Sequence, residues 1–219
     1  MPQTSRDSVR TAWILFATAF AAGAVDIIGF AKLGGVFASA MTGNFALLAY
    51  HVARGNTWSA IGSVIALLGF VCGCLIGFTL RRGRSARTTI TLLLGTEAAL
   101  LLVFAVLAWW GAGTVRQQII ILAVAMGLQA VVGQMISLST IVFTTTLTRL
   151  IGGIADAIAT RSSTGMRDIG EQVTLIASYL VGALLAGVLI VRAINGVVLL
   201  PLAGIAVALG AHQLGGRRA

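Results

Sequence analysis

Long apolar runs alternate with short polar or basic stretches along the whole chain. Six runs hold about 20 residues each, the length that a helix rising 1.5 Å per residue needs to cross a hydrocarbon core of roughly 30 Å. They are Trp13–Ala31, Trp58–Leu80, Thr89–Trp110, Gln117–Ile136, Gln172–Val191 and Val197–Leu214. Tryptophans begin two of these runs and end a third, as is typical of aromatic rings at the headgroup level of a bilayer. The pattern predicts an all-α bundle of six membrane-crossing helices.

Two further runs, Val36–Ala53 and Leu138–Ala159, are interrupted by hydroxyl, amide and charged side chains. Either both cross the membrane, which gives eight crossings, or both enter it and leave on the same side as broken segments, which leaves six. The second arrangement requires that protein or water shields the irregular backbone, because lipid cannot satisfy free peptide groups.

Basic residues between the runs favour the second arrangement. If both segments cross and the N-terminus is cytoplasmic, the densest basic cluster, 81–87, lies outside, and eight basic residues inside face six outside, with Arg149 unassigned. If neither segment crosses, the division is ten inside to four outside. Because cytoplasmic loops carry the excess of Lys and Arg, we expect six crossings, two re-entrant segments and both termini in the cytoplasm.

The two polar segments occupy matching places in the two halves of the chain. Asp26 precedes Thr42 by 16 positions, and Gln129 precedes Thr144 by 15. We expect one integral membrane domain over residues 1–219, built from two units at about 11–110 and 117–214. Three crossings per unit make the second unit inverted relative to the first, which is typical of secondary transporters with a site near the middle of the membrane. The alternative is that both segments are packed hairpins of a structural protein.

Composition excludes other classes of protein. The chain is 58% hydrophobic and 10% charged, with a mean hydropathy of +1.00, whereas soluble domains carry roughly 25% charged residues. The net charge of +9 is spread between apolar runs, so we expect the lipid bilayer, and not a nucleic acid, as the partner. Cys72 and Cys74 point to different faces of a helix, which favours neither a disulfide nor a metal site.

Two stretches of sequence resemble a known family. The first reads AGAVDIIGF at 22–30 and GGVFASAMTGN at 34–44, and the second reads MGLQ at 126–129 and TTTLTRL at 144–150. Together they resemble the signature of the YoaK-type bacterial membrane proteins, a family of unknown function. Ala130 and Thr145 depart from it, because the family usually has Asn and Gly there. The resemblance implies a multi-pass protein of the bacterial inner membrane and supplies no substrate.

Two acids lie within predicted crossings. An ionisable group there costs at least ~2.5–3.5 kcal/mol, so Asp26 and Glu97 should face a polar interior or a partner. Asp26 is either a proton carrier or a structural group that accepts hydrogen bonds from backbone amides freed near Gly29, Gly34 and Gly35. Glu97 is either a proton carrier or a protonated hydrogen-bond donor to a neighbouring helix.

Both polar segments could place a helix N-terminus inside the membrane. Such an end offers free amides and partial positive charge to an anionic or polar solute. We expect the sharp turn of the first segment at Thr42-Gly43-Asn44, and that of the second at Thr144, Thr145 and Thr146. Two such ends facing each other would form a polar chamber. The other side chains that we expect to line this chamber are those of Asp26, Gln129 and Gln134.

Two other features have packing or electrostatic interpretations. Arg149, near the predicted chamber, could neutralise Asp26 or Glu97, bind an anionic solute, or reach the cytoplasmic headgroups. Small residues recur every four positions at Gly69, Gly73 and Gly77, which favours close helix packing within the chain or across a homodimer.

The sequence contains no recognisable catalytic motif, metal-ligand cluster or cofactor-binding loop, so we expect neither an enzyme nor a bound cofactor. The leading hypothesis is a secondary transporter of a small polar or anionic solute, with protons as the candidate coupling ion. The alternative is a membrane scaffold or assembly protein that does not transport.

Overall fold

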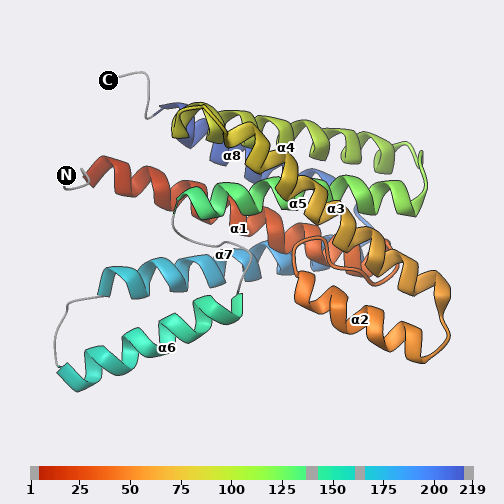
Figure 1. Ribbon diagram of the computed structural model, residues 1–219, viewed down its shortest axis with the longest axis horizontal. Coiled ribbons are helices and arrows are strands. Elements are labelled where there is room, and N and C mark those ends of the chain that lie inside the picture. Colours follow the sequence, from red (N-terminus) through yellow and green to blue (C-terminus); the bar gives the residue numbers. More distant parts are fainter. Residues whose placement is uncertain (1–4, 137–142, 161–165, 215–219) are drawn as a thin grey trace.

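The computed structural model describes residues 5–136, 143–160 and 166–214, and within these ranges it contains helices and no strand (Figure 1). The helices are α1 (Ser5–Lys32), α2 (Met41–Ala53), α3 (Thr57–Arg81), α4 (Ala86–Trp109), α5 (Val115–Met135), α6 (Phe143–Thr160), α7 (Met166–Val191), the short 3-10 helix η1 (Asn195–Leu199) and α8 (Leu200–Leu214).

Six segments of the described ranges are long and apolar enough to cross a membrane, and they confirm the six predicted crossings. They are Thr11–Lys32, Thr57–Arg81, Ala86–Trp109, Val115–Met135, Asp168–Val191 and Asn195–Leu214. In Figure 1 these long helices lie side by side and both termini are at the left-hand end.

The two polar segments supply the remaining helices, α2 and α6, as predicted. Neither is among the six candidate spans, and the 13 residues of α2 extend only about 20 Å, which is too short for the hydrocarbon core. Figure 1 places α2 beside one end of the bundle and α6 beside the other. α2 packs on α3, and α6 packs on α7.

The chain reverses direction between α1 and α2 at two glycines. Gly34 and Gly35 have φ of 88° and 80°, a region that glycine enters without steric cost. The chain then returns along α1, so close that a Cβ on Gly29 would lie 2.7 Å from the Val36 carbonyl oxygen. The sharp turn thus precedes the position predicted for it, because Thr42-Gly43-Asn44 already belongs to the first turn of α2.

Two helix pairs make the closest backbone contacts, α1 with α7 and α3 with α5. A Cβ on Gly182 of α7 would lie 2.1 Å from the Phe20 carbonyl oxygen of α1, and one on Gly23 would lie 2.1 Å from that of Tyr179. Both helix pairs therefore pack through glycines that no larger residue could replace without moving a helix.

The predicted glycine ladder forms the second of these interfaces. A Cβ on Gly73 would lie 2.2 Å from the Val124 carbonyl oxygen, while Gly69 faces Ala123 and Gly77 faces Val131. All three glycines are buried within a single chain. The ladder therefore packs α3 on α5 and offers no surface for a homodimer.

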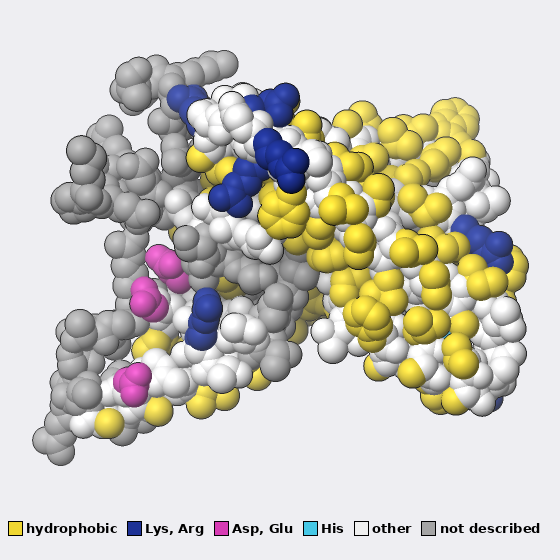
Figure 2. All heavy atoms as spheres, in the orientation of Figure 1, with side chains coloured by type: hydrophobic (Ala, Val, Ile, Leu, Met, Phe, Trp, Pro, Cys, Tyr) yellow, Lys and Arg dark blue, Asp and Glu magenta, His cyan; other side chains and the backbone are white. Residues whose placement is uncertain are grey.

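The outer surface has the character expected of a bilayer protein. Figure 2 shows hydrophobic side chains over much of the visible face, with basic side chains gathered towards the ends. Large apolar side chains such as Leu68, Leu75, Leu180 and Leu184 are exposed on the long helices. In water this surface would be unstable, and in lipid it needs no cover.

Candidate functional site

Asp26 lies on α1 facing the returning segment 33–40, and it is fully buried. Its Oδ1 accepts hydrogen bonds from the backbone N–H groups of Ala38 and Ser39 at 2.9 and 2.7 Å. Its Oδ2 accepts from the Ser39 hydroxyl at 2.6 Å and from the Tyr179 hydroxyl of α7 at 2.9 Å. Asp26 thus ties the re-entrant segment and α7 to α1, which is the structural role considered for it above.

Asn44 holds the same segment from α2. Its side-chain oxygen accepts from the Phe37 N–H at 3.0 Å, and its side-chain nitrogen donates to the Phe37 carbonyl oxygen. Asn44 is fully buried, so both of its hydrogen-bonding groups are satisfied away from water. Together Asp26 and Asn44 give the irregular backbone of residues 37–39 the partners that lipid cannot supply.

The neighbours of Asn44 lie differently. Thr42 is exposed, and the first turn of α2 has no side-chain cap. Gly43 packs under the Phe37 ring, where an added Cβ would approach the ring carbons to 2.9 Å. Of the predicted Thr42-Gly43-Asn44 group, only Asn44 joins the network around Asp26.

Gln129 and Gln134, both on α5, also differ in their burial. Gln129 is fully buried, and its Nε2 donates to the Thr18 carbonyl oxygen of α1 at 3.1 Å. Its Oε1 has no hydrogen-bond partner among the described residues. Gln134 is exposed. The structure therefore places Gln129 in the core and Gln134 on the surface.

Glu97 lies in the middle of α4, on a buried stripe that includes Leu94, Leu101 and Phe104. It is fully buried, and neither carboxyl oxygen has a hydrogen-bond partner among the described residues. Burying the charged form of an unpartnered carboxyl group is far more costly than burying its neutral form. Glu97 is therefore the buried acid whose hydrogen-bonding capacity the described fold leaves unused.

The second polar segment is described in part. The side chain of Thr144 lies outside the described residues, Thr145 is exposed and Thr146 is buried. Arg149 is exposed on α6. In Figure 1 the N-terminal ends of α2 and α6 point towards one another near the middle of the bundle, and the two helices run from there towards opposite ends. The polar chamber expected between the two turns stays a prediction, because residues 137–142 lie outside the described residues.

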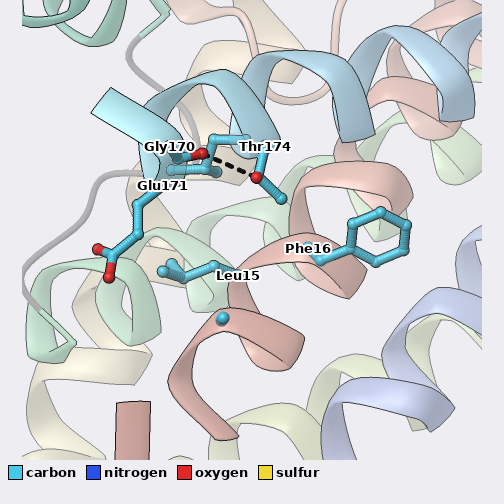
Figure 3. Close-up of a pocket in the computed structure, with 7 residues that line it drawn as sticks. Leu15, Phe16, Gly170, Glu171 and Thr174 are labelled. Carbon is cyan, nitrogen blue, oxygen red and sulfur yellow. Dashed lines mark hydrogen bonds between the residues drawn. The ribbon is translucent and has the colours of Figure 1, made fainter. Parts of the chain in front are cut away.

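A cavity of about 240 Å³ opens between α1 and the start of α7 (Figure 3). Its lining residues are Ala12, Leu15, Phe16, Gly170, Glu171, Thr174 and Leu175. In Figure 3 the Glu171 carboxylate points away from Phe16, and the Thr174 hydroxyl donates to the Gly170 carbonyl oxygen at 2.8 Å. None of the residues predicted from the sequence lines this cavity.

Three residues of these networks were missed in the sequence. Ser39 was visible as a polar residue of the first segment, without a role. Tyr179 is one of only 2 tyrosines and sits in an apolar run, a signal that could have marked it as the partner of a buried group. Thr18, which supplies the carbonyl group for Gln129, contributes only backbone and left no signal.

Comparison with known proteins agrees with this architecture. The family described as "Protein of unknown function (DUF1275)" matches residues 14–211. The chain is 34% identical over 174 residues to the UPF0700 transmembrane protein YoaK of Bacillus subtilis (strain 168), covering 75% of this chain and 77% of that protein. No solved structure matches the chain. This multi-pass membrane protein therefore belongs to the DUF1275 family and is similar to YoaK.

Proposed function

We propose that the protein is a secondary transporter of a small polar or anionic solute, built from two inverted units and coupled to protons. The observation that carries the proposal is the pair of matching glycine contacts, in which α3 packs on α5 in the way that α7 packs on α1. Inverted units with corresponding interrupted segments are the architecture of many secondary transporters.

The correspondence between α3 and α7 extends along both helices. Five buried positions of α3 have a buried counterpart in α7 at the same distance along the sequence; Ala60, the remaining buried position of α3, does not. They are Ser63, Ala66, Gly69, Gly73 and Gly77 in α3, and Gln172, Leu175, Ser178, Gly182 and Ala186 in α7. The small residues at the last three positions of each set let both helices approach their partners closely.

The partners α1 and α5 correspond in the same manner. A Cβ on Gly23 of α1 would meet the Tyr179 carbonyl oxygen, and one on Gly127 of α5 would lie 2.3 Å from the Phe70 carbonyl oxygen. By this correspondence α4 is related to α8, and α2 to α6. Rocking of one unit against the other would open the bundle alternately to each side.

Glu97 is the proposed proton-coupling group. All four hydrogen bonds of Asp26 hold the fold together, whereas the carboxyl group of Glu97 is buried without a partner. Three more buried oxygen atoms have no hydrogen-bond partner in the described ranges, Ser63 Oγ, Gln129 Oε1 and Gln172 Oε1, and the first two belong to helices that pack together, α3 and α5. Glu97, Ser63 and Gln129 are the proposed solute and proton ligands of the core.

Proteoliposomes test the proposal directly. Liposomes containing the protein and a pH-sensitive dye receive gradients of small carboxylates, amino acids and inorganic phosphate, one at a time. We expect at least one solute to change the internal pH, and Glu97→Gln to abolish the change. Asp168→Asn, which removes an exposed acid at the start of α7, is the matched control and should transport normally. If no member of the panel moves, or if Glu97→Gln transports normally, proton-coupled transport is excluded.

We also propose that both termini lie in the cytoplasm and that the membrane is the bacterial inner membrane. The basic cluster Arg81, Arg82, Arg84 and Arg87 joins α3 to α4 at the end of the bundle where both termini lie (Figure 1). A cysteine introduced at position 84 should resist an impermeant thiol reagent in intact cells and react after the membrane is opened. Labelling in intact cells would reverse the orientation.

A further inference from the structure

A second cavity, of about 260 Å³, lies at the end of the bundle opposite the termini. It is formed where the ends of α1 and α4 meet the starts of α5 and η1. Its polar groups are Lys32, Gln118 and Asn195, and its apolar walls include Phe104 and Val198. The space far exceeds the 10–15 Å³ that one water molecule requires, and it is just below the range of pockets for drug-sized ligands.

We propose that this cavity, the Lys32 cavity, binds a small oxyanion of the phosphate type. Lys32 supplies an ammonium group and Asn195 a side-chain amide group, while the Gln118 Nε2 already donates one hydrogen bond to the Ala112 carbonyl oxygen at 3.4 Å and has one N–H left. Val115, the first residue of α5, also lines the cavity, so the partial positive charge of a helix N-terminus adds to that of Lys32. The Lys32 cavity is distinct from the proposed ligands in the core and binds its anion whether or not the protein transports.

The charge distribution at this end favours an anion. Lys32, Arg54, Arg116 and Arg192 all lie at the ends of helices here. The acids outside the core whose side chains are described, Asp156, Asp168 and Glu171, lie on α6 and at the start of α7, at the other end of the bundle. Figure 2 shows acidic side chains on the left, away from this end. Lys32 is the one charged residue that lines the cavity, and the charged residues nearest to it along the bundle are basic.

Two of the four cations at this end, Arg54 and Arg116, are engaged with aromatic side chains, whereas Lys32 and Arg192 are not. The Arg116 guanidinium group lies 4.1 Å from the centre of the Trp58 ring, and Arg54 donates a hydrogen bond to the Tyr50 hydroxyl. Within the described residues Lys32 makes neither an ion pair nor a side-chain hydrogen bond. Lys32 lies in the last turn of α1, where its positive charge interacts favourably with the helix dipole. This interaction explains a lysine at the end of a helix but does not explain the cavity beside it.

Two sources could supply the oxyanion. The tryptophans Trp58, Trp109 and Trp110 lie at the same end of the bundle, at the expected level of lipid headgroups. The ligand could thus be the phosphate group of an anionic phospholipid or a free phosphate ion. Both offer the same charged oxygen atoms to Lys32, so the experiment must separate them.

The composition of the chain gives a direct measurement. Lys32 is the one lysine of the sequence, so an amine-reactive acylating reagent can modify only Lys32 and the N-terminal amine. The protein is placed in nanodiscs of phosphatidylcholine and acylated at increasing concentrations of inorganic phosphate at constant ionic strength. Peptide mass spectrometry then gives the two rates separately, with the N-terminal amine as the internal reference.

A free phosphate ligand should slow acylation of Lys32 about tenfold at a concentration ten times its Kd and leave the N-terminal amine unaffected. If the ligand is a headgroup, nanodiscs containing phosphatidylglycerol should protect Lys32 without added phosphate. If neither phosphate nor phosphatidylglycerol protects Lys32, the cavity binds no oxyanion and the proposal is wrong.

Two variants locate the binding site. Asn195→Ala keeps the lysine as the reporter and should weaken the protection, because it removes an amide group of the cavity. Arg54→Gln removes one positive charge from the same end and does not change a residue of the cavity. In this variant the anion should protect Lys32 from acylation as well as it does in the unmodified protein. Equal protection in both variants would place the anion elsewhere. By equilibrium dialysis with labelled phosphate, Lys32→Gln should weaken binding about tenfold to a hundredfold, the usual effect of losing one charged hydrogen-bond donor.

Discussion

The contact between α1 and α7 and the contact between α3 and α5 share a backbone arrangement and differ in chemistry. In each, a glycine of one helix faces a carbonyl oxygen of the other, and the relation is reciprocal. In the first contact, the residue three positions after Gly23 is Asp26, which accepts a hydrogen bond from Tyr179. In the second, the residue three positions after Gly127 is Ala130, and Phe70 stands at the place of Tyr179.

The difference shows what the polar residues do. The backbones of α3 and α5 approach each other equally closely with only apolar and small side chains between them. A close helix contact through glycines therefore does not require residues such as Asp26 and Tyr179. The polar network of the α1–α7 contact serves the re-entrant segment instead, because three of the four hydrogen bonds of Asp26 come from Ala38 and Ser39. The corresponding segment of the other half, 137–142, lies outside the described residues.

The largest effect is expected where the two contacts agree. Gly182→Ala and Gly73→Ala each place a Cβ about 2 Å from a backbone carbonyl oxygen, so the helices must separate. Each variant should lose about 3 kcal/mol or more of unfolding free energy, or fail to accumulate, as measured by tryptophan fluorescence during unfolding of the purified protein. Gly187→Ala is the control on α7, because its added Cβ meets open space. A large loss in only one of the two variants would show that the contacts are not equivalent.

A smaller effect should distinguish the polar contact from the apolar one. Asp26→Asn replaces one acceptor oxygen by an amide group that cannot accept from Ser39 or Tyr179, so the variant should lose about 2 kcal/mol. Hydrogen exchange should quicken at the backbone amides of Ala38 and Ser39 and remain unchanged along α3 and α5. Asp168→Asn, a change at an exposed acid, is the control. Unchanged exchange at residues 38 and 39 would mean that Asp26 does not hold the re-entrant segment.

Tyr179→Phe makes the polar contact resemble the apolar one. Asp26 keeps its three other donors, so we expect a loss of about 1 kcal/mol in the same unfolding measurement. The reciprocal change, Phe70→Tyr, adds a hydroxyl group where α5 offers no acid and should gain nothing. The effect of Tyr179→Phe should shrink in the background of Asp26→Asn, because the two residues share one hydrogen bond. If the losses of unfolding free energy from the two substitutions simply add, the hydrogen bond between Tyr179 and Asp26 does not contribute to stability.

The sequence predicts the parts of this molecule that depend on local composition. The six crossings follow from the length of the apolar runs, and the packing role of Gly69, Gly73 and Gly77 follows from their helical spacing. The hydrogen bonds that Asp26 accepts from the Ala38 and Ser39 amides correspond to one of the two roles that the nearby glycines indicate for it. Each of these signals lies within about 20 residues of sequence, so no tertiary information is needed to see it.

The rest depends on contacts between distant parts of the chain. Tyr179 lies 153 residues from Asp26, and no local pattern pairs them. The chamber expected between the two polar turns stays a prediction, because residues 137–142 of the second segment lie outside the described residues. The turn expected at Thr42-Gly43-Asn44 lies at Gly34 and Gly35 instead, because φ there is positive.

The smallest effect is expected at Thr42, which lies beside the polar network without joining it. Thr42→Val keeps the shape of an exposed side chain and removes its hydroxyl group, so stability should change by no more than about 0.5 kcal/mol. Asn44→Ala is the comparison within the same turn, and it should cost about 1 kcal/mol or more because the Phe37 backbone loses both of its partners. A loss at Thr42 as large as that at Asn44 would show that the hydroxyl group supports the fold. Normal stability together with lost solute uptake in Thr42→Val would show instead that this exposed hydroxyl group meets the solute, and would extend the difference between the two halves from packing to transport.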